Sequence, residues 1–291
     1  MLYEIKLVTT CTYGRAAAGR QLLRLMPADW PEGQRLIAGS IDIRPAPQER
    51  SDRYDFFGNR TSEVTFSTAN EEVEFVVRAR VDRFAQPPTL DLSPKLDRLT
   101  AEIAAVESLD PMSPHHYIDA SPLVRPSEAI ADYVNEIVDP KGTTLEAVKT
   151  INAGLYRDMR YDGEATTVDT PLEEAFAKRR GVCQDFTHIM IACLREIGIP
   201  AGYVSGFLRT EPPKGKPRLE GADAMHAWVQ AWCGLDAGWV EFDPTNRMMA
   251  GADHIVAARG RDYSDVAPVR GMLRTSGGQD ISQAVDVLPV G

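Results

Sequence analysis

The chain has 291 residues, of which 43% are hydrophobic and 25% charged, and these proportions exclude collagen-like, coiled-coil and intrinsically disordered proteins. Its 42 acidic and 32 basic residues give a net charge of −10, which argues against a nucleic-acid partner because binding to phosphates needs a basic surface. No apolar run approaches the ~20 residues of a membrane helix, and the first residues lack the pattern of a secretory signal. We therefore expect a cytoplasmic protein with no membrane partner.

Residues 1–90 are expected to form a small antiparallel β domain. Polar and apolar residues alternate there in three segments that turn residues separate, at positions 2–8, 36–43 and 73–81. A group of prolines marks the end of this region. We assign residues 91–291 to a second domain, whose core lies at 150–250.

The second domain begins with helices and continues with strands. Helical spacing and capping signals predict helices near positions 96–106, 127–138, 143–159, 170–181 and 183–197. Hairpin-like strands follow from 199 to 243, and a polar tail leads to a last strand near 285–290. Helices followed by strands, without regular alternation, indicate an α+β fold in which helices pack on an antiparallel sheet.

Four cysteines stand at positions 11, 183, 193 and 233, far apart and never as Cys-x-x-Cys. This spacing disfavours a disulfide framework and a structural zinc site. No pair of histidines has the spacing of zinc ligands either. The sequence therefore predicts neither a metal nor a cofactor.

Cys183 stands at the start of a predicted helix. Phe186, Ile189, Met190, Cys193 and Leu194 form an apolar stripe at intervals of three and four, and Cys183 begins the same stripe one turn earlier. The N-terminus of a helix stabilises an anion, which favours the thiolate form of a cysteine at this position. Cys183 is thus a candidate nucleophile. The alternative is a small buried hydrophobic residue, which is also the interpretation of Cys193.

A predicted β-hairpin brings a histidine and an acid together. Its strands cover 226–232 and 239–243, and the turn between them places His226 opposite or nearly opposite Asp243 on one face. A carboxylate so placed orients the imidazole and stabilises its protonated form, so that His226 could exchange protons with a thiol. A slip of one residue would separate the pair. Glu241, on the same face, is the rival acid, and an incidental pair is the alternative.

These segments resemble the transglutaminase-like superfamily. The resemblance rests on Gly-Val-Cys-Gln-Asp-Phe at 181–186, on His-Ala-Trp at 226–228 and on Gly-Trp-Val-Glu-Phe-Asp-Pro-Thr at 238–245. Asp-Phe-Phe-Gly-Asn at 55–59 and the segment 260–271 are similar to the flanking regions of the bacterial proteins. The resemblance implies a papain-like core with Cys183 as nucleophile, His226 as base and Asp243 as the orienting acid.

The same resemblance implies a thiol enzyme that acts on amide bonds through a thioester, as a cysteine protease, an amidase or a protein-glutamine acyltransferase. Its substrate would be a protein or peptide with an amide or glutamine side chain. Animal transglutaminases have a tryptophan upstream of the nucleophile, which this chain lacks near Cys183, so Tyr161 is a candidate oxyanion donor and Trp228 a candidate substrate contact. The alternative function is a catalytically silent scaffold that binds a protein partner.

Overall fold

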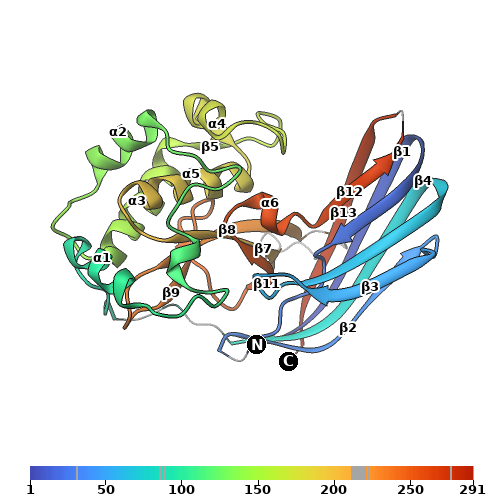
Figure 1. Ribbon diagram of the computed structural model, residues 1–291, viewed down its shortest axis with the longest axis horizontal. Coiled ribbons are helices and arrows are strands. Elements are labelled where there is room, and N and C mark those ends of the chain that lie inside the picture. Colours follow the sequence, from blue (N-terminus) through green and yellow to red (C-terminus); the bar gives the residue numbers. More distant parts are fainter. Residues whose placement is uncertain are drawn as a thin grey trace, which may run out of the picture.

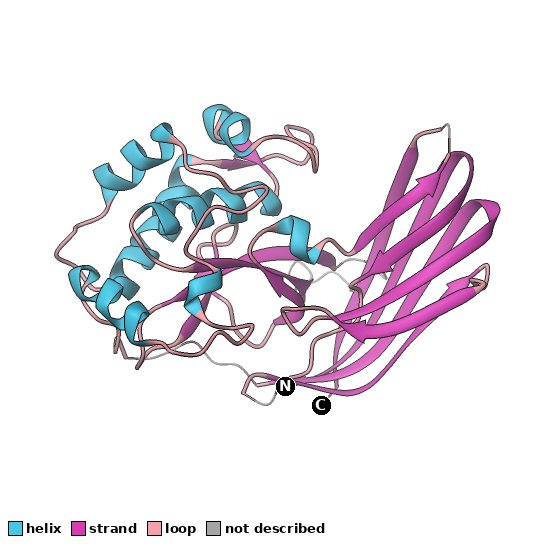
Figure 2. Ribbon diagram, in the orientation of Figure 1, coloured by secondary structure: helices cyan, strands magenta, loops and turns pink. Residues whose placement is uncertain are grey.

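The computed structural model describes residues 1–30, 32–84, 87, 90–210, 221, 223–275 and 277–290. The molecule is elongated, with helices at one end, a large sheet at the other and a second sheet between them (Figures 1 and 2). Both large sheets consist of antiparallel pairs. The predicted α+β fold class is confirmed.

Six strands form the large sheet at one end of the molecule. Its two longest strands, β1 (Leu2–Leu23) and β4 (Arg60–Arg83), pair along most of their length. Two further strands, β2 (Gln34–Arg44) and β3 (Glu49–Tyr54), pair with β4. The alternation predicted for this region is present, and the strands extend well beyond the predicted segments because long-range pairing continues them.

The last strands of the chain also belong to this sheet. Strand β12 (Val269–Arg274) pairs with the second half of β1, and β13 (Gln279–Val290) pairs with its first half. The two ends of the chain therefore lie close together (Figure 1). The expected second domain, 91–291, does not correspond to this arrangement, since 269–290 complete the first sheet. We propose that the first domain comprises 1–84 together with 269–290.

The sheet in the middle of the molecule has five strands in the order β10-β9-β8-β7-β11. They are β7 (Ala201–Leu208), β8 (Ala224–Trp232), β9 (Trp239–Asp243), β10 (Met248–Met249) and β11 (His254–Gly260). The predicted hairpin is β8 and β9. The segment interpreted as a polar tail contains β11, which is almost entirely buried.

Helix α5 (Cys183–Glu196) lies at the centre of the helical end. It packs against α2, α3, α4, β7 and β8, and its apolar stripe points into the main hydrophobic core. The predicted helices are α1 (Leu96–Ala105), α2 (Glu128–Ile137), α3 (Thr144–Asp158), α4 (Leu172–Lys178) and α5. Four short elements complete the fold: the 3-10 helix η1 (Pro114–His116), β5 (Arg160–Tyr161), β6 (Arg180–Gly181) and α6 (Tyr263–Val266). No helix within the described part of the chain is long and apolar enough to cross a membrane.

Two buried side-chain amides join the large sheet to β11. Gln34 donates to the carbonyl of Val256 (2.8 Å) and accepts its N–H (2.9 Å). Asn59 donates to the carbonyl of Arg259 (2.7 Å) and accepts its N–H (2.7 Å). Strand β11 is an edge strand, so these amides satisfy backbone groups that a further strand would otherwise pair.

Replacing Asn59 by alanine is expected to destabilise the folded protein by about 2 kcal/mol, because two partly buried backbone groups of Arg259 lose their partners. Urea denaturation followed by circular dichroism measures this change. Asn135→Ala, at an exposed position of α2, is the control and should change stability by no more than about 0.5 kcal/mol. Equal stabilities of the two variants would contradict the bridging role of Asn59.

Candidate active site

Cys183 is the first residue of α5 and is half-buried, whereas Cys11, Cys193 and Cys233 are buried. The turn before it is fixed by Asp185, whose carboxylate accepts the N–H of Val182 (2.8 Å). Asp185 is thus an acid in the first turn of the helix. The thiol lies at the positive end of the dipole of α5, a helix that packs against α2, α3, α4, β7 and β8.

His226 and Asp243 are hydrogen-bonded, with 2.8 Å between Nε2 of the imidazole and Oδ2 of the carboxylate. The register of the hairpin differs from the predicted one by two residues, since Val229 pairs with Phe242. His226 and Asp243 are therefore diagonal neighbours. A shift of two keeps the alternation of faces, so the two side chains still meet.

Asp243 is fully buried and accepts five hydrogen bonds. Its Oδ1 accepts the backbone N–H groups of Thr245 (3.0 Å) and Asn246 (3.1 Å). Its Oδ2 accepts from the side chain of Asn246 (2.7 Å) and faces His226 and His254. Burial alone would raise the pKa of Asp243, but these donors, with His226 first, outweigh it and hold the pKa well below its usual value. The group is a fixed carboxylate.

The surroundings of His226 favour its protonated form. Burial lowers its pKa, but the hydrogen bonds to Asp243 and Cys183, together with their charges, raise the pKa to about 10. Cys183 thus lies within interaction range of the imidazole. Because Nε2 of His226 faces Asp243, Nδ1 is the nitrogen left for the thiol.

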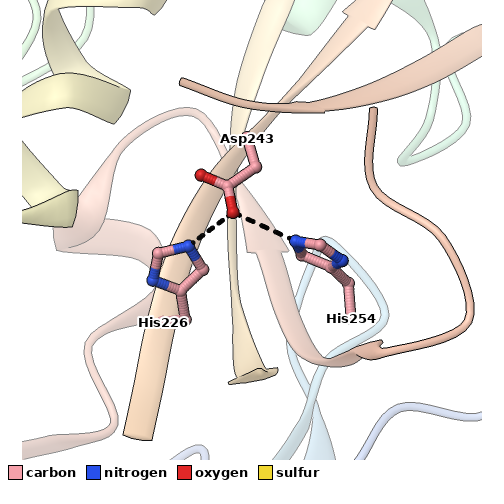
Figure 3. A group of neighbouring side chains, drawn as sticks. All are labelled: His226, Asp243 and His254. Atoms are coloured by element: carbon pink, nitrogen blue, oxygen red, sulfur yellow. Dashed lines mark hydrogen bonds and ion pairs between the residues drawn. The ribbon is translucent and has the colours of Figure 1, made fainter. Parts of the chain in front are cut away.

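His254 is a member of this cluster that the sequence analysis placed in a polar tail. It begins β11, is buried, and its Nε2 lies 3.1 Å from Oδ2 of Asp243 (Figure 3). No local pattern identifies it, because its partner is eleven residues earlier in the chain and on a strand that does not pair with β11.

Glu241, the rival acid, has other partners. Its carboxylate pairs with Arg83 (2.9 Å) and Arg259 and accepts the indole N–H of Trp228 (3.1 Å). Burial raises the pKa of Glu241, but the charges of the two arginines outweigh it and lower the pKa to about 2. The hairpin therefore offers two carboxylates, and Asp243 is the one that contacts His226.

The two candidates for oxyanion or substrate contact lie in different surroundings. Tyr161 is 59% exposed and pairs with Gly181, two residues before Cys183. Partial burial of the ring raises the pKa of Tyr161, and the negative charge of a Cys183 thiolate raises it further. The two side chains therefore interact electrostatically. Trp228 has no exposed surface and its N–H is bonded to Glu241. The ring packs against that of His226 and presents no surface to solvent, so the contact of Trp228 with substrate stays a prediction.

The polar groups of residues 261–265 have structural roles. Arg261 pairs with Asp265 (2.8 Å), and Asp262 caps α6 through the N–H of Ser264 (2.8 Å). The backbone N–H of Tyr263 donates to His188 (3.2 Å).

His226, Asp243 and His254 also offer ligand atoms close enough together for a metal ion. Each of these atoms already takes part in a hydrogen bond with another member of the group (Figure 3). We therefore treat the cluster as a hydrogen-bond network and assign no metal to it.

Comparison with known proteins identifies the family. Residues 131–244 match the model of the transglutaminase-like superfamily, and residues 3–82 match that of the bacterial transglutaminase-like N-terminal region. An uncharacterized protein of Mycobacterium tuberculosis is 35% identical over 301 residues, covering 99% of this chain and 90% of that protein. The chain belongs to the transglutaminase-like superfamily.

Two further proteins are similar to this transglutaminase-like protein. An uncharacterized protein of Mycobacterium leprae is 30% identical over 262 residues, covering 87% of this chain and 86% of that protein. The crystal structure of a "putative cysteine protease" from Cytophaga hutchinsonii superposes with a TM-score of 0.70 at 19% identity, covering 100% of this chain and 92% of that one. The expected family resemblance is thus confirmed, and the structural likeness confirms the fold.

The raised pKa of His226 predicts that the stability of the protein depends on pH. Between 6.5, its ordinary value, and about 10, the folded state binds more protons than the unfolded state. The contribution of His226 to the free energy of unfolding is fully present below pH 6.5 and is lost as the pH rises through about 10. We expect the melting temperature to fall over this interval, and to fall less in His226→Gln. Calorimetry at constant ionic strength measures both slopes, and equal slopes would contradict the shift.

Proposed function

We propose that this transglutaminase-like protein is a thiol enzyme that acts on amide bonds through Cys183, His226 and Asp243. The observation that supports this proposal is the hydrogen bond of 2.8 Å between His226 and the buried Asp243, beside a thiol at the start of α5. A protonated imidazole in contact with a thiol stabilises the thiolate, which is the reactive form.

The proposed reaction has two steps. The sulfur of Cys183 bonds to the carbonyl carbon of the amide, the carbon–nitrogen bond breaks, and His226 gives its proton to the departing amine. The acyl group is then a thioester. Water or a second amine attacks this thioester, His226 takes the proton from the attacking group, and the thiolate leaves. Water yields a carboxylate, and an amine yields a new amide.

The proposed substrate is a protein or peptide that presents an amide or glutamine side chain. Incubation of the purified protein with a glutamine-containing peptide, with and without a primary amine, tests the proposal by mass spectrometry. A glutamate product, an amine conjugate or cleavage of the peptide bond would support it and would show which acceptor is used. If several such peptides give no product and no acyl adduct forms on Cys183, the catalytically silent scaffold is the better interpretation.

Tyr161 is proposed to donate a hydrogen bond to the oxyanion, together with the backbone N–H of Cys183. Tyr161→Phe is expected to lower kcat by roughly 10²-fold while KM changes little, because a donor aimed at the oxyanion acts mainly in the transition state. Tyr156→Phe removes the hydroxyl of a half-exposed tyrosine on α3 and is the control. Equal kcat values for the two variants would show that Tyr161 is not a donor.

A further inference from the structure

We propose that His254 is a positioning residue, which holds the carboxylate of Asp243 in the orientation that His226 needs. This inference rests on the proposed function for its catalytic meaning. The contact between His254 and Asp243 is a separate matter of geometry, and it can be tested without any substrate.

Asp243 lies between two imidazoles (Figure 3). His226 comes from β8 and His254 from β11, and both direct Nε2 at the same carboxylate oxygen, at 2.8 and 3.1 Å. The ring of His254 is buried and packs edge-on against Trp228, with 5.2 Å between ring centres. A buried imidazole that is fixed on two sides defines where the shared oxygen lies.

The second ring nitrogen of His254 determines which tautomer is present. The backbone N–H of Gly251 donates to Nδ1 (3.4 Å), so Nδ1 carries the lone pair and Nε2 carries the proton. His254 therefore donates to Asp243 as a neutral group. It fixes the carboxylate without adding a second positive charge beside His226.

The charged groups that face the ring of His254 come from the strands around it. Asp243 of β9 contacts it directly, and His226 of β8 lies 6.2 Å away between ring centres. The neighbouring Asp253 is engaged elsewhere, with Arg209 (3.0 Å) and Tyr3 (2.7 Å). Asp243 and His226 are thus the groups through which a change at His254 would act.

Two substitutions separate the hydrogen bond from the packing. His254→Phe keeps a flat ring but removes the donor, so that the buried carboxylate turns toward Asn246 and its other donors and holds His226 less firmly. His254→Gln keeps an amide that can donate to Asp243 and accept from Gly251. If His254 acts by positioning Asp243, the alkylation rate of Cys183 and the titration midpoint of His226 should fall in His254→Phe and should be restored in His254→Gln.

Alkylation of Cys183 by iodoacetamide at pH 6, followed by mass spectrometry, is the first readout. We expect His254→Phe to slow alkylation by about tenfold, a small part of the 10²–10⁴ that a positioned acid–base group contributes. His254→Gln should stay within about threefold of the wild type. If wild-type Cys183 reacts quickly at pH 6, an unchanged rate in His254→Phe, or an equal loss in both variants, would overturn the inference.

Nuclear magnetic resonance of protein labelled with 15N-histidine is the second readout, on a Cys183→Ser background that removes the thiol. At pH 8, His254 should carry its proton on Nε2. His254→Phe should lower the titration midpoint of His226 by roughly half a pH unit, and His254→Gln should restore it. A proton on Nδ1 of His254, or a midpoint that is unchanged or higher in His254→Phe, would overturn the inference.

The two readouts separate the two proposals. If wild-type Cys183 alkylates slowly at pH 6 but the magnetic resonance results are as expected, the proposed thiol chemistry is wrong and the positioning of Asp243 by His254 stands. If Cys183 is reactive at pH 6 but the tautomer of His254 or the change in the titration midpoint of His226 differs from the expected one, the thiol chemistry stands and His254 has only a packing role.

Discussion

Cys183→Ala is expected to abolish thioester formation and to lower kcat by roughly 10⁴-fold or more, because the other thiol of the helix, Cys193, is fully buried. The side chain is small and half-buried, so the substitution should leave the fold intact. Product formation from a glutamine-containing peptide, with circular dichroism as a check of folding, measures the effect.

Cys193→Ala is the matched control for this variant. Cys193 lies on the same helix but is fully buried in the core, and burial raises the pKa of its thiol to about 12. Its loss should reduce stability by about 1 kcal/mol without changing kcat. A Cys183→Ala protein whose kcat stays within tenfold of the wild type would show that Cys183 is not the nucleophile.

Asp243→Asn is expected to lower kcat by roughly 10²- to 10⁴-fold and to reduce stability by about 3 kcal/mol. The substitution keeps the shape but removes the charge that helps to raise the pKa of His226. It also turns an amide NH₂ toward groups that donate, either the two backbone N–H groups at Oδ1 or the histidines and Asn246 at Oδ2. We expect the alkaline limit of activity to move to lower pH.

Asp253→Asn is the control for the loss of a carboxylate. Asp253 is half-exposed and pairs with Arg209, so its replacement should cost no more than about 1 kcal/mol and leave the pH profile unchanged. Urea denaturation and the dependence of kcat on pH measure both variants. If Asp243→Asn were as active and as stable as Asp253→Asn, Asp243 would not be the acid that orients His226.

Local patterns predict a large part of the fold and the central pair of the site. The apolar residues from Phe186 to Leu194 repeat with the period of a helix, and this segment forms α5. The residues on both sides of the turn at Gly234 alternate with the period of a strand, and they form the β8–β9 hairpin. These features could be predicted because each depends on residues close together in the sequence. The predicted register of the hairpin differs from the observed one by two residues. Because this number is even, His226 and Asp243 stay on the same face of the sheet and still make contact.

Features that depend on distant parts of the chain could not be predicted from local patterns. The pairing of β13 with β1 joins segments more than 260 residues apart. His254 reaches Asp243 only because β11 adds to β7 on the far side of the sheet. Trp228 lies on the same face of β8 as His226, but its ring packs in a buried cluster with Val256 of β11 and with Ala28 and Trp30 of the β1–β2 connection. Its indole N–H binds Glu241.

The large sheet and the proposed site are physically connected. Arg83, at the end of β4, is buried and pairs with Glu241, whose carboxylate binds the indole N–H of Trp228. Trp228 in turn stacks on His226, with 6.2 Å between ring centres. Truncation of the first domain would therefore remove support for His226, and assays should use the full chain.

Alkylation of Cys183 by iodoacetamide as a function of pH tests most directly whether its sulfur is an anion paired with His226. The wild-type protein should react quickly well below neutrality, and His226→Gln should lose this reactivity at pH 6 while still reacting near pH 9. A wild-type thiol that reacts only near pH 8.5, like an ordinary cysteine, or a rate that His226→Gln leaves unchanged, would contradict the pairing.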